Sequence, residues 1–356
     1  MAADRPVAVP IVALAGAALS AAAVVLAAAS GGTAWRAWMA AAFLAFSASA
    51  GSIGFLMMLR IIPGAWREEL AGLFDAHTRL LPIGLIAGLP VLFTLASIYP
   101  WPHRHEATEF RAAYLSQGFF IGRTLIWWAV LGGLAILLTG PKGRSVALAS
   151  IGLMLFTLLG TTGAVDWLES IDPNFASSGF GLYLICTQLL TGLALCVLEA
   201  AAGKAPLKRP QVLGGVLVVL LLLWNYLAFM QYFIVWSGDL PPGAAWYIRR
   251  VRHGWGAVMW VVALSRLAPL FALFFGPVRA SRRWLAAMSA VIATGTVFEF
   301  AWLALPRDSR TVGAAEAAVY LLGVAGLALI GAALLRRLRA RSQKEEAAIG
   351  GLEATS

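Results

Sequence analysis

The chain has 356 residues, of which 60% are hydrophobic and 12% are charged, and its formal net charge is +10. Its apolar residues form continuous runs of about 20, the length of a helix that crosses a lipid bilayer. Strands of a membrane barrel would alternate in hydropathy, so these runs exclude a barrel and favour helices. We therefore predict an all-α polytopic membrane protein, and we assign its positive charge to topology and lipid headgroups rather than to nucleic acid.

Ten membrane spans are expected along the chain. The first run resembles a signal peptide at Ala27, Ala28 and Ala29, but it is longer than a usual signal peptide core, so we interpret it as an uncleaved helix. An even number of spans places both ends of the chain on the same side of the membrane. The predicted spans are 8–29, 36–59, 80–99, 114–138, 145–166, 178–200, 212–236, 254–276, 283–304 and 314–335.

The basic residues of the connecting segments predict the orientation, because cytoplasmic loops carry an excess of Lys and Arg. With the N-terminus in the cytoplasm, the cytoplasmic segments hold 17 of these residues and the outer segments hold 8. Both termini are therefore expected in the cytoplasm. The loop between spans five and six is then an outer loop, and it contains no Lys or Arg.

The domain organisation follows from the lengths of the connections. The longest ones, about 60–79 and 237–253, are too short to hold a separate core. We therefore expect a single membrane domain over residues 1–338. Residues 339–356 are rich in charge and are expected to form a disordered cytoplasmic tail.

The chain offers few ligands for a redox centre. A haem inside the membrane usually takes histidine ligands at bilayer depth. The four histidines fall instead in predicted loops or at span ends: His77, His103, His105 and His253. Cys186 and Cys196 lie ten residues apart in one apolar run, without a haem-attachment or cluster motif. We therefore expect that this chain itself binds no haem, iron–sulfur cluster or metal.

Ionisable side chains inside the spans are the main candidates for function, because a charge in the bilayer is costly. Arg123 in span four, Arg266 in span eight and Glu299 in span nine are the deepest, and Asp166 lies at the outer end of span five. Two interpretations stay open. Either an arginine and Glu299 form a pair that only fixes helix packing, or these four residues belong to a proton pathway in which the arginines tune the carboxylates.

Two outer segments are richer in polar and aromatic residues than a connection needs. They are "DWLESIDPNFASSGFG" (166–181) and "NYLAFMQYFIVWSGDLPPGAAWYIRR" (225–250). In the first, Asp166 is expected to belong to the helix and Asp172-Pro173 to form a turn. Such surroundings suit either an aromatic belt or a pocket for a lipid-soluble ring such as a quinone. The candidates for this pocket or outer-face motif are Trp167, Ser170, Asp172, Pro173, Tyr226, Gln231, Trp236 and Asp239.

The same segments resemble a known family. The first contains Asp166-Trp167-x-x-Ser170-x-Asp172-Pro173-x-Phe175, and the second contains Tyr226-Leu227-Ala228-Phe229-x-Gln231 followed by Trp236-Ser237-Gly238-Asp239-Leu240-Pro241. These motifs are similar to those of the second NrfD-like membrane subunit of alternative complex III, which is the second quinone-binding subunit of a quinol:cytochrome c oxidoreductase. The resemblance covers nearly all ten predicted spans.

The resemblance implies two four-helix bundles with flanking helices in a bacterial inner membrane. The implied partners are a sister NrfD-like subunit and, on the outer face, iron–sulfur and multihaem cytochrome c subunits, which would hold the clusters and haem c. In that family quinol is oxidised mainly at the sister subunit, and this type of subunit contributes to proton movement and assembly. The resemblance thus implies proton-pathway residues and room for a quinone contact in this chain.

The chain departs from the family pattern at two places. Asp172-Pro173-Asn174-Phe175 stands where Glu-Pro-His-Trp is common, and Arg266 stands near an expected histidine. Two groups that titrate near neutral pH are therefore replaced, while Glu299 meets the expectation of an acid in span nine. A secondary transporter that works alone, or a structural assembly subunit, stays as an alternative function.

Overall fold

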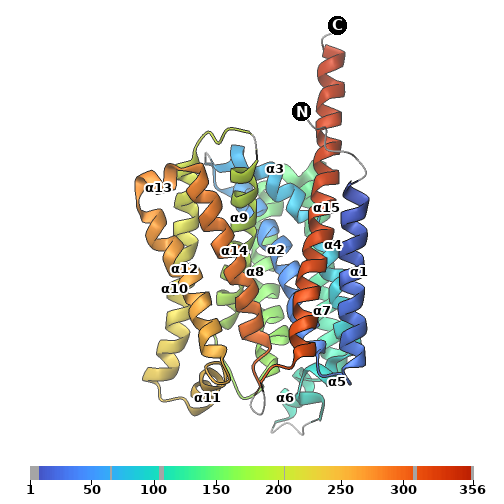
Figure 1. Cartoon of the computed structure of the whole chain (residues 1–356), viewed down its shortest axis with the longest axis vertical. Coiled ribbons are helices and arrows are strands. Elements are labelled where there is room, and N and C mark those ends of the chain that lie inside the picture. The colour runs from blue at the N-terminus through green and yellow to red at the C-terminus, as the bar shows by residue number, and fades with distance from the viewer. Residues whose placement is uncertain (1–7, 65, 104–107, 204, 308–310, 354–356) are drawn as a thin grey trace.

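The computed structural model describes residues 8–64, 66–103, 108–203, 205–307 and 311–353, and this part of the chain contains helices and no strand (Figure 1). The predicted all-α fold class is confirmed. The α-helices are α1 (Ala8–Ala29), α2 (Trp35–Ile61), α3 (Trp66–Thr78), α4 (Leu81–Phe93), α5 (Leu95–Ile98), α6 (Glu109–Tyr114), α7 (Gln117–Thr139), α8 (Val146–Trp167), α9 (Phe180–Ala202), α10 (Pro210–Ser237), α11 (Pro241–Arg249), α12 (Trp255–Phe274), α13 (Gly276–Ala280), α14 (Arg282–Ala304) and α15 (Ala314–Glu353).

Ten segments of the described chain are long and apolar enough to cross a membrane, as predicted. Ordinary helix signals set their ends. Ser145 Oγ accepts a hydrogen bond from Leu148 N at 3.2 Å at the start of α8, and Pro210 begins α10. Large apolar side chains are exposed on the outside of the spans, where a soluble protein would place polar ones. The chain is therefore a multi-pass integral membrane protein.

The segment 60–79, expected to be a connection, contains helix α3. Leu70, Phe74 and His77 recur at helical spacing and are buried on one face of it. Arg79, just beyond α3, donates a hydrogen bond to Thr139 O at the end of α7 (2.9 Å). We infer that α3 lies along one end of the bundle and that α4, with α5, forms the third crossing.

Two further segments are helical where the sequence led us to expect otherwise. Residues 237–253 contain α11, which begins at a Pro-Pro pair and buries Trp246. α15 continues to Glu353, past residue 338, where a disordered tail was expected to begin. Residues 336–349 include many strong helix formers such as Arg, Lys, Gln, Glu and Ala, and no Gly or Pro occurs before Gly350. The structure thus describes residues 339–353 as a helical continuation of α15.

The spans form two four-helix bundles with two flanking helices, the arrangement that the resemblance implies. Contacts join α2, α4, α7 and α8 in the first bundle, and α9, α10, α12 and α14 in the second. α2 packs against α9, so these two helices form the junction between the bundles. α1 and α15 pack together at the side of α2 (Figure 1).

Two glycines allow α2 and α9 to approach each other closely. A Cβ atom on Gly192 of α9 would lie 2.7 Å from Ser52 N and 2.8 Å from Gly51 C, both of them backbone atoms of α2. Small residues at such crossings let membrane helices pack with their backbones nearly in contact. The spacing of the two bundles therefore depends on glycine at this point.

We expect Gly192→Ala to lower the free energy of unfolding by about 1–3 kcal/mol, the usual cost of overpacking, because the added methyl group must separate α2 from α9. Gly133→Ala in α7 is the matched control, since a Cβ atom there meets no neighbour within 4 Å. Alanine favours a helix over glycine, so the control should be neutral or more stable. Denaturant unfolding of both variants in detergent measures the difference, and equal stabilities would contradict the close approach.

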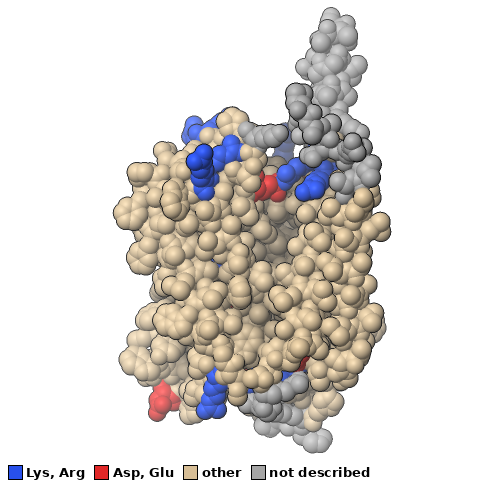
Figure 2. Space-filling model, in the orientation of Figure 1, with Lys and Arg blue, Asp and Glu red and all other residues tan. Residues whose placement is uncertain are grey.

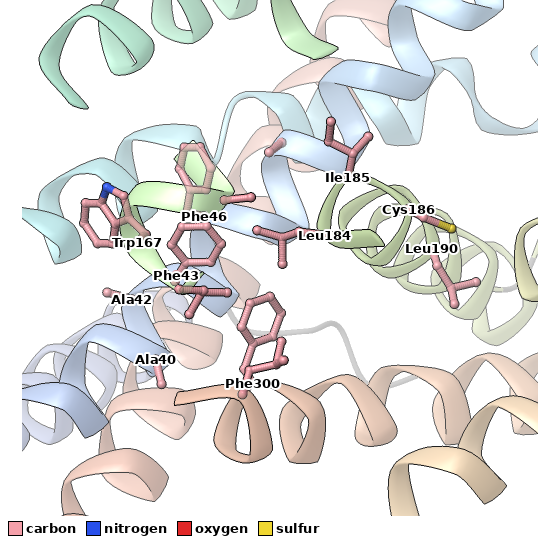
Figure 3. Close-up of a cluster of buried hydrophobic side chains, with 14 of the residues drawn as sticks. Ala40, Ala42, Phe43, Phe46, Trp167, Leu184, Ile185, Cys186, Leu190 and Phe300 are labelled. Atoms are coloured by element: carbon pink, nitrogen blue, oxygen red, sulfur yellow. The ribbon is translucent and has the colours of Figure 1, made fainter. Parts of the chain in front are cut away.

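Phe43 of α2 connects the cores of the two bundles (Figure 3). Its ring centroid lies 5.6 Å from that of Trp167 in α8 and 5.8 Å from that of Phe300 in α14. Aromatic rings at these separations contribute packing energy beyond the area that they bury. The core is therefore continuous and apolar between the first bundle and the second.

The start of α1 and the end of α15 lie at the same end of the molecule (Figure 1). This agrees with the even number of spans. We call this end the inner end and the opposite one the outer end, following the charge asymmetry of the loops. That the inner end faces the cytoplasm stays a prediction.

Candidate functional site

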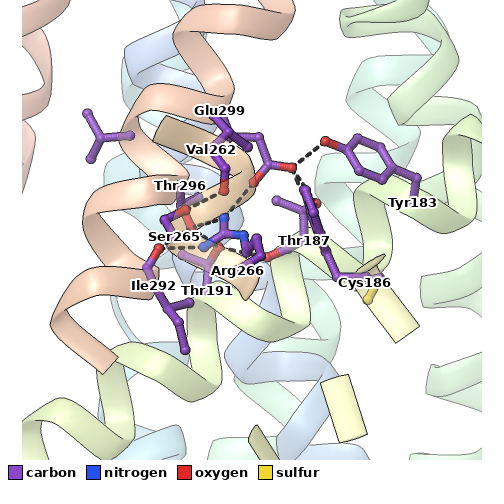
Figure 4. Close-up of polar contacts among 12 residues, drawn as sticks. Tyr183, Cys186, Thr187, Thr191, Val262, Ser265, Arg266, Ile292, Thr296 and Glu299 are labelled. Atoms are coloured by element: carbon purple, nitrogen blue, oxygen red, sulfur yellow. Dashed lines mark hydrogen bonds and ion pairs between the residues drawn. The ribbon is translucent and has the colours of Figure 1, made fainter. Parts of the chain in front are cut away.

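Arg266 and Glu299 form an ion pair inside the second bundle (Figure 4). Arg266 comes from α12 and Glu299 from α14, and Arg266 Nη2 donates to Glu299 Oε2 at 2.6 Å. Both side chains are 0% exposed. Because removing a charge from water costs several kcal/mol, each of these residues depends on the other to remain buried in ionised form.

Three further side chains donate hydrogen bonds to the Glu299 carboxylate. Thr187 Oγ1 and Trp224 Nε1 lie 3.1 Å and 3.0 Å from Oε1, and the Tyr183 hydroxyl also donates to Oε1. Thr187 and Tyr183 come from α9 and Trp224 from α10. All four helices of the second bundle therefore meet at this one carboxylate.

Arg266 is held by contacts besides Glu299. It donates to Ile292 O at 2.7 Å and to Thr296 Oγ1 at 2.8 Å, both on α14. Its guanidinium carbon lies 5.3 Å from the ring centre of Trp224, within reach of a cation–π interaction. The guanidinium is thus fixed by two neighbouring helices rather than by the carboxylate alone.

A second arginine–carboxylate pair lies near the outer end of the first bundle. Arg123 of α7 contacts Asp166 of α8 through two hydrogen bonds of 2.8 Å, Nε to Oδ2 and Nη2 to Oδ1. Such bidentate pairs are strong and directional. Arg123 also lies over the Tyr114 ring, 3.9 Å from its centre. Burial, followed by the Asp166 charge, raises the pKa of Tyr114 to about 12, so this hydroxyl keeps its proton at neutral pH.

The two pairs occupy corresponding places in the two bundles. In each bundle the arginine is on the third helix in chain order, and the carboxylate is near the outer end of the fourth. Asp166 lies one residue before the end of α8, whereas Glu299 lies five residues before the end of α14. Since a helical turn takes about 3.6 residues, Glu299 is about one turn deeper.

Aromatic side chains separate the two pairs. Trp167 follows Asp166 in the chain, Phe300 follows Glu299, and the Phe43 ring packs against both. Within the described part of the chain, the hydrogen-bond partners of the two carboxylates have no residue in common. We therefore treat the pairs as two separate sites.

The three acids of segment 166–181 have three different partners. Asp166 contacts Arg123, Glu169 accepts a hydrogen bond from Ser177 N at 2.6 Å, and Asp172 forms an ion pair with Arg249. Glu169 and Ser177 line an outer cavity of about 940 Å³. Segment 166–181 is therefore folded and lines the outer cavity. Its three acids do not form a cluster.

The candidates for a quinone pocket do not converge on one place. Tyr226 and Trp236 of α10 are 59% and 68% exposed on the outside of the second bundle, followed by the exposed turn residue Asp239. Trp167 is buried, and its Nε1 donates to Thr124 Oγ1 at 3.2 Å. The exposure of Tyr226 and Trp236 favours a role in the aromatic belt.

The remaining candidates lie around the outer cavity or beside it. Ser170 and Pro173 line the cavity. Asp172 is paired with Arg249, which also lines it. Gln231 is 9% exposed, and its Oε1 accepts a hydrogen bond from Ser177 Oγ at 3.4 Å. Of the candidates, Ser170 and Pro173 are thus the two that line the outer cavity directly.

Sequence reasoning missed a third polar cluster, at the inner end. His77 Nε2 of α3 lies 2.9 Å from Glu199 Oε2 of α9, and Arg339 of α15 contacts the same carboxylate. His77 was assigned to a loop because α3 was not recognised. The spacing of His77 from Leu70 and Phe74 is the signal that would have placed it on a buried helical face.

Among the described residues, no group of three His, Cys, Asp or Glu side chains could hold a metal ion, and His105 lies outside these residues.

A search of protein-family models finds none that matches the chain, and a search of curated proteins finds no significant match. The chain is a multi-pass helical membrane protein. The resemblance to an NrfD-like subunit therefore stays a prediction from the motifs of its two outer segments.

Proposed function

We propose that the chain is an integral membrane subunit of a respiratory quinol:cytochrome c oxidoreductase in a bacterial inner membrane. In this proposal it contributes proton-pathway residues, while partner subunits hold the haem c and the iron–sulfur clusters. The support comes from the motif resemblance and from one structural observation, the buried carboxylate of Glu299 at the meeting point of four helices. A buried ionisable group inside a membrane is a candidate for proton transfer by default.

Polar groups lead from this carboxylate toward the outer end. Tyr183 donates to it, and Gln231 approaches α9 one turn further out, with its Cγ 3.8 Å from the position of a Cβ atom on Gly179. Gln231 bonds to Ser177, whose backbone N–H donates to Glu169 in the wall of the outer cavity. These polar groups lie between the outer cavity and the carboxylate, and we propose that a proton passes along this side of the bundle, with the hydroxyls of Ser177 and Tyr183 as its carriers.

In the inward direction, the series of polar groups that begins at Glu299 ends after two residues. Thr296 accepts a hydrogen bond from Arg266, and Thr191 Oγ1 lies 3.4 Å from Thr296 Oγ1. Thr191 lines an inner cavity whose wall is mainly apolar beyond this point. We therefore propose that Glu299 exchanges protons with the outer side, where the partner subunits are expected.

The proposed step at the site is a proton transfer between two oxygen atoms. The Tyr183 hydroxyl gives its proton to Glu299 Oε1 and regains one from the outer route, so that no net charge remains on the tyrosine. Arg266 holds Oε2 through this exchange and limits the carboxylate to one orientation. Asp166 with Arg123 forms a second, shallower proton-holding site in the first bundle.

One observation favours a second candidate, a structural assembly subunit. The Glu299 carboxylate already has four donors, which a packing role would require as much as a chemical one. In secondary transporters the substrate site is typically formed by broken helices at mid-membrane. The four helices that contact Glu299 or Arg266 are each continuous along their described length, so no observation favours that alternative.

Purification from the native membrane in mild detergent tests the respiratory role. We expect a tagged chain to retain a sister membrane subunit together with proteins that show haem c absorbance and iron–sulfur signals. An unrelated tagged multi-pass protein from the same membrane is the control for carry-over. A chain that purifies alone, free of redox proteins under conditions that keep other respiratory complexes intact, would contradict the proposal.

A further inference from the structure

An inner cavity of about 820 Å³ opens between α14 and α15. Figure 2 shows this face hollowed, with an acidic side chain among basic ones at the upper, inner end. Tyr320 of α15 donates a hydrogen bond to Val297 O of α14 at 2.5 Å. Elsewhere along its described length, α15 packs mainly against α1 and α2. The two helices thus leave a groove whose floor is formed by α2 and α9.

Small apolar residues make the groove deep. Ala45 and Ala48 of α2, Ala293 of α14, and Ala328 and Gly331 of α15 line it. Its volume is in the range of sites for small organic ligands, roughly 300–1,000 Å³. Apolar cavities of this kind do not hold water well. The walls therefore suit a hydrocarbon chain and are unsuited to an ion or a polar solute.

The mouth of the groove carries a positive charge that has no acidic partner in the described part of the chain. Arg336 lines the mouth, is exposed, and forms no ion pair with any residue in the described part of the chain. The one acid at the mouth, Glu199, is already engaged by His77 at 2.9 Å and by Arg339. The charge at the mouth is therefore net positive, at the end of the spans where lipid headgroups lie.

We propose that this groove binds one anionic phospholipid. Its acyl chain lies between α14 and α15, and its phosphate binds the Arg336 guanidinium, which donates in a geometry that matches phosphate oxygens. A zwitterionic phospholipid offers the same chain without the net charge and binds more weakly. The site does not depend on the respiratory role proposed above, since it uses neither Glu299 nor the outer cavity.

Native mass spectrometry of the full chain in detergent tests the site, with phosphatidylglycerol and phosphatidylcholine as probes added separately. We expect one phosphatidylglycerol to remain bound in preference to phosphatidylcholine. Arg336→Gln should reduce that preference by about fivefold, the effect of one basic residue at a membrane surface. Arg337→Gln is the matched control, because Arg337 is exposed and does not line the groove, and it should leave the preference unchanged.

Ala328→Trp fills the groove and should abolish retention of both lipids. Equal effects of Arg336→Gln and Arg337→Gln would overturn the proposal, because they would indicate attraction of lipid by surface charge in general. Retention of a neutral isoprenoid that depends on Ala328 but not on Arg336 would overturn it as well. The comparison of the two arginine variants decides the question even if the tryptophan variant does not fold.

Discussion

Replacing Arg266 with methionine should lower the free energy of unfolding by about 3–5 kcal/mol, the cost of leaving a buried charge without its partner. Methionine keeps an apolar stem like that of arginine, so most of the aliphatic packing of the side chain is retained. Glu299 would remain 0% exposed, with three neutral donors and no positive charge nearby. Denaturant titration of the purified chain in detergent, followed by tryptophan fluorescence, measures the loss.

Two further variants separate the charge effect from other causes. The double variant Arg266→Met/Glu299→Leu removes both charges and should recover most of the lost stability. Lys208→Met breaks the exposed Lys208–Glu68 pair, whose side chains are 75% and 67% exposed, and should cost under about 1 kcal/mol. A double variant as unstable as Arg266→Met would mean that packing, and not charge, holds this site together.

If the proposed respiratory function holds, Glu299→Gln should reduce the proton-coupled quinol oxidation of each assembled complex by about 100-fold or more, the usual contribution of a positioned proton-transfer group. Glutamine keeps the shape of the side chain, and its amide oxygen still accepts from Tyr183, Thr187 and Trp224. Its NH2 group, however, faces Arg266 and leaves that buried charge without its partner, so the variant is also less stable and its activity is measured per assembled complex. Glutamine cannot take up a proton at the position of Oε1. Proton release by the purified complex in liposomes, measured together with quinol oxidation, reports the effect.

The control for this experiment is Glu68→Gln, since Glu68 is 67% exposed on α3 at the inner end and should not affect turnover. Asp166→Asn is a useful comparison. Because aromatic side chains separate the two ion pairs, we expect this variant to lower turnover less than Glu299→Gln does, and independently of it. If Glu299→Gln keeps both full quinol oxidation and full proton coupling, the proton role is excluded and the assembly role takes its place.

The spans could be predicted because each is a continuous apolar run of bilayer length. α3 could not be recognised in the same way, since it is amphipathic and its buried face rests on only a few positions such as Leu70 and Phe74. Hydropathy identifies segments that are apolar on most sides, whether those sides meet lipid or, as in α2 and α9, other helices. It is weak for a helix that lies at the end of a bundle with one side in water.

The pairing of the intramembrane charges could not be read from the sequence. Asp166 is 43 residues from Arg123, and Glu299 is 33 residues from Arg266, with each partner on a different span. Which arginine meets which acid depends on how the spans divide into bundles, and nothing in the spacing decides this. The same holds for Tyr183 and Trp224, which are ordinary aromatic residues of apolar helices until the fold brings them to the Glu299 carboxylate.

The burial of the Arg266–Glu299 pair has an electrical consequence. While both groups are ionised the pair carries no net charge, so the membrane potential exerts no net force on it. A proton on Glu299 leaves one positive charge inside the field, and a full crossing of the membrane by such a charge corresponds to about 2.3 kcal/mol per 100 mV. If the outer end faces the positive side of the membrane, as the loop charges predict, protonation of Glu299 from that side becomes more favourable when the membrane is energised. The gain corresponds to the fraction of the field that lies between the outer cavity and Glu299.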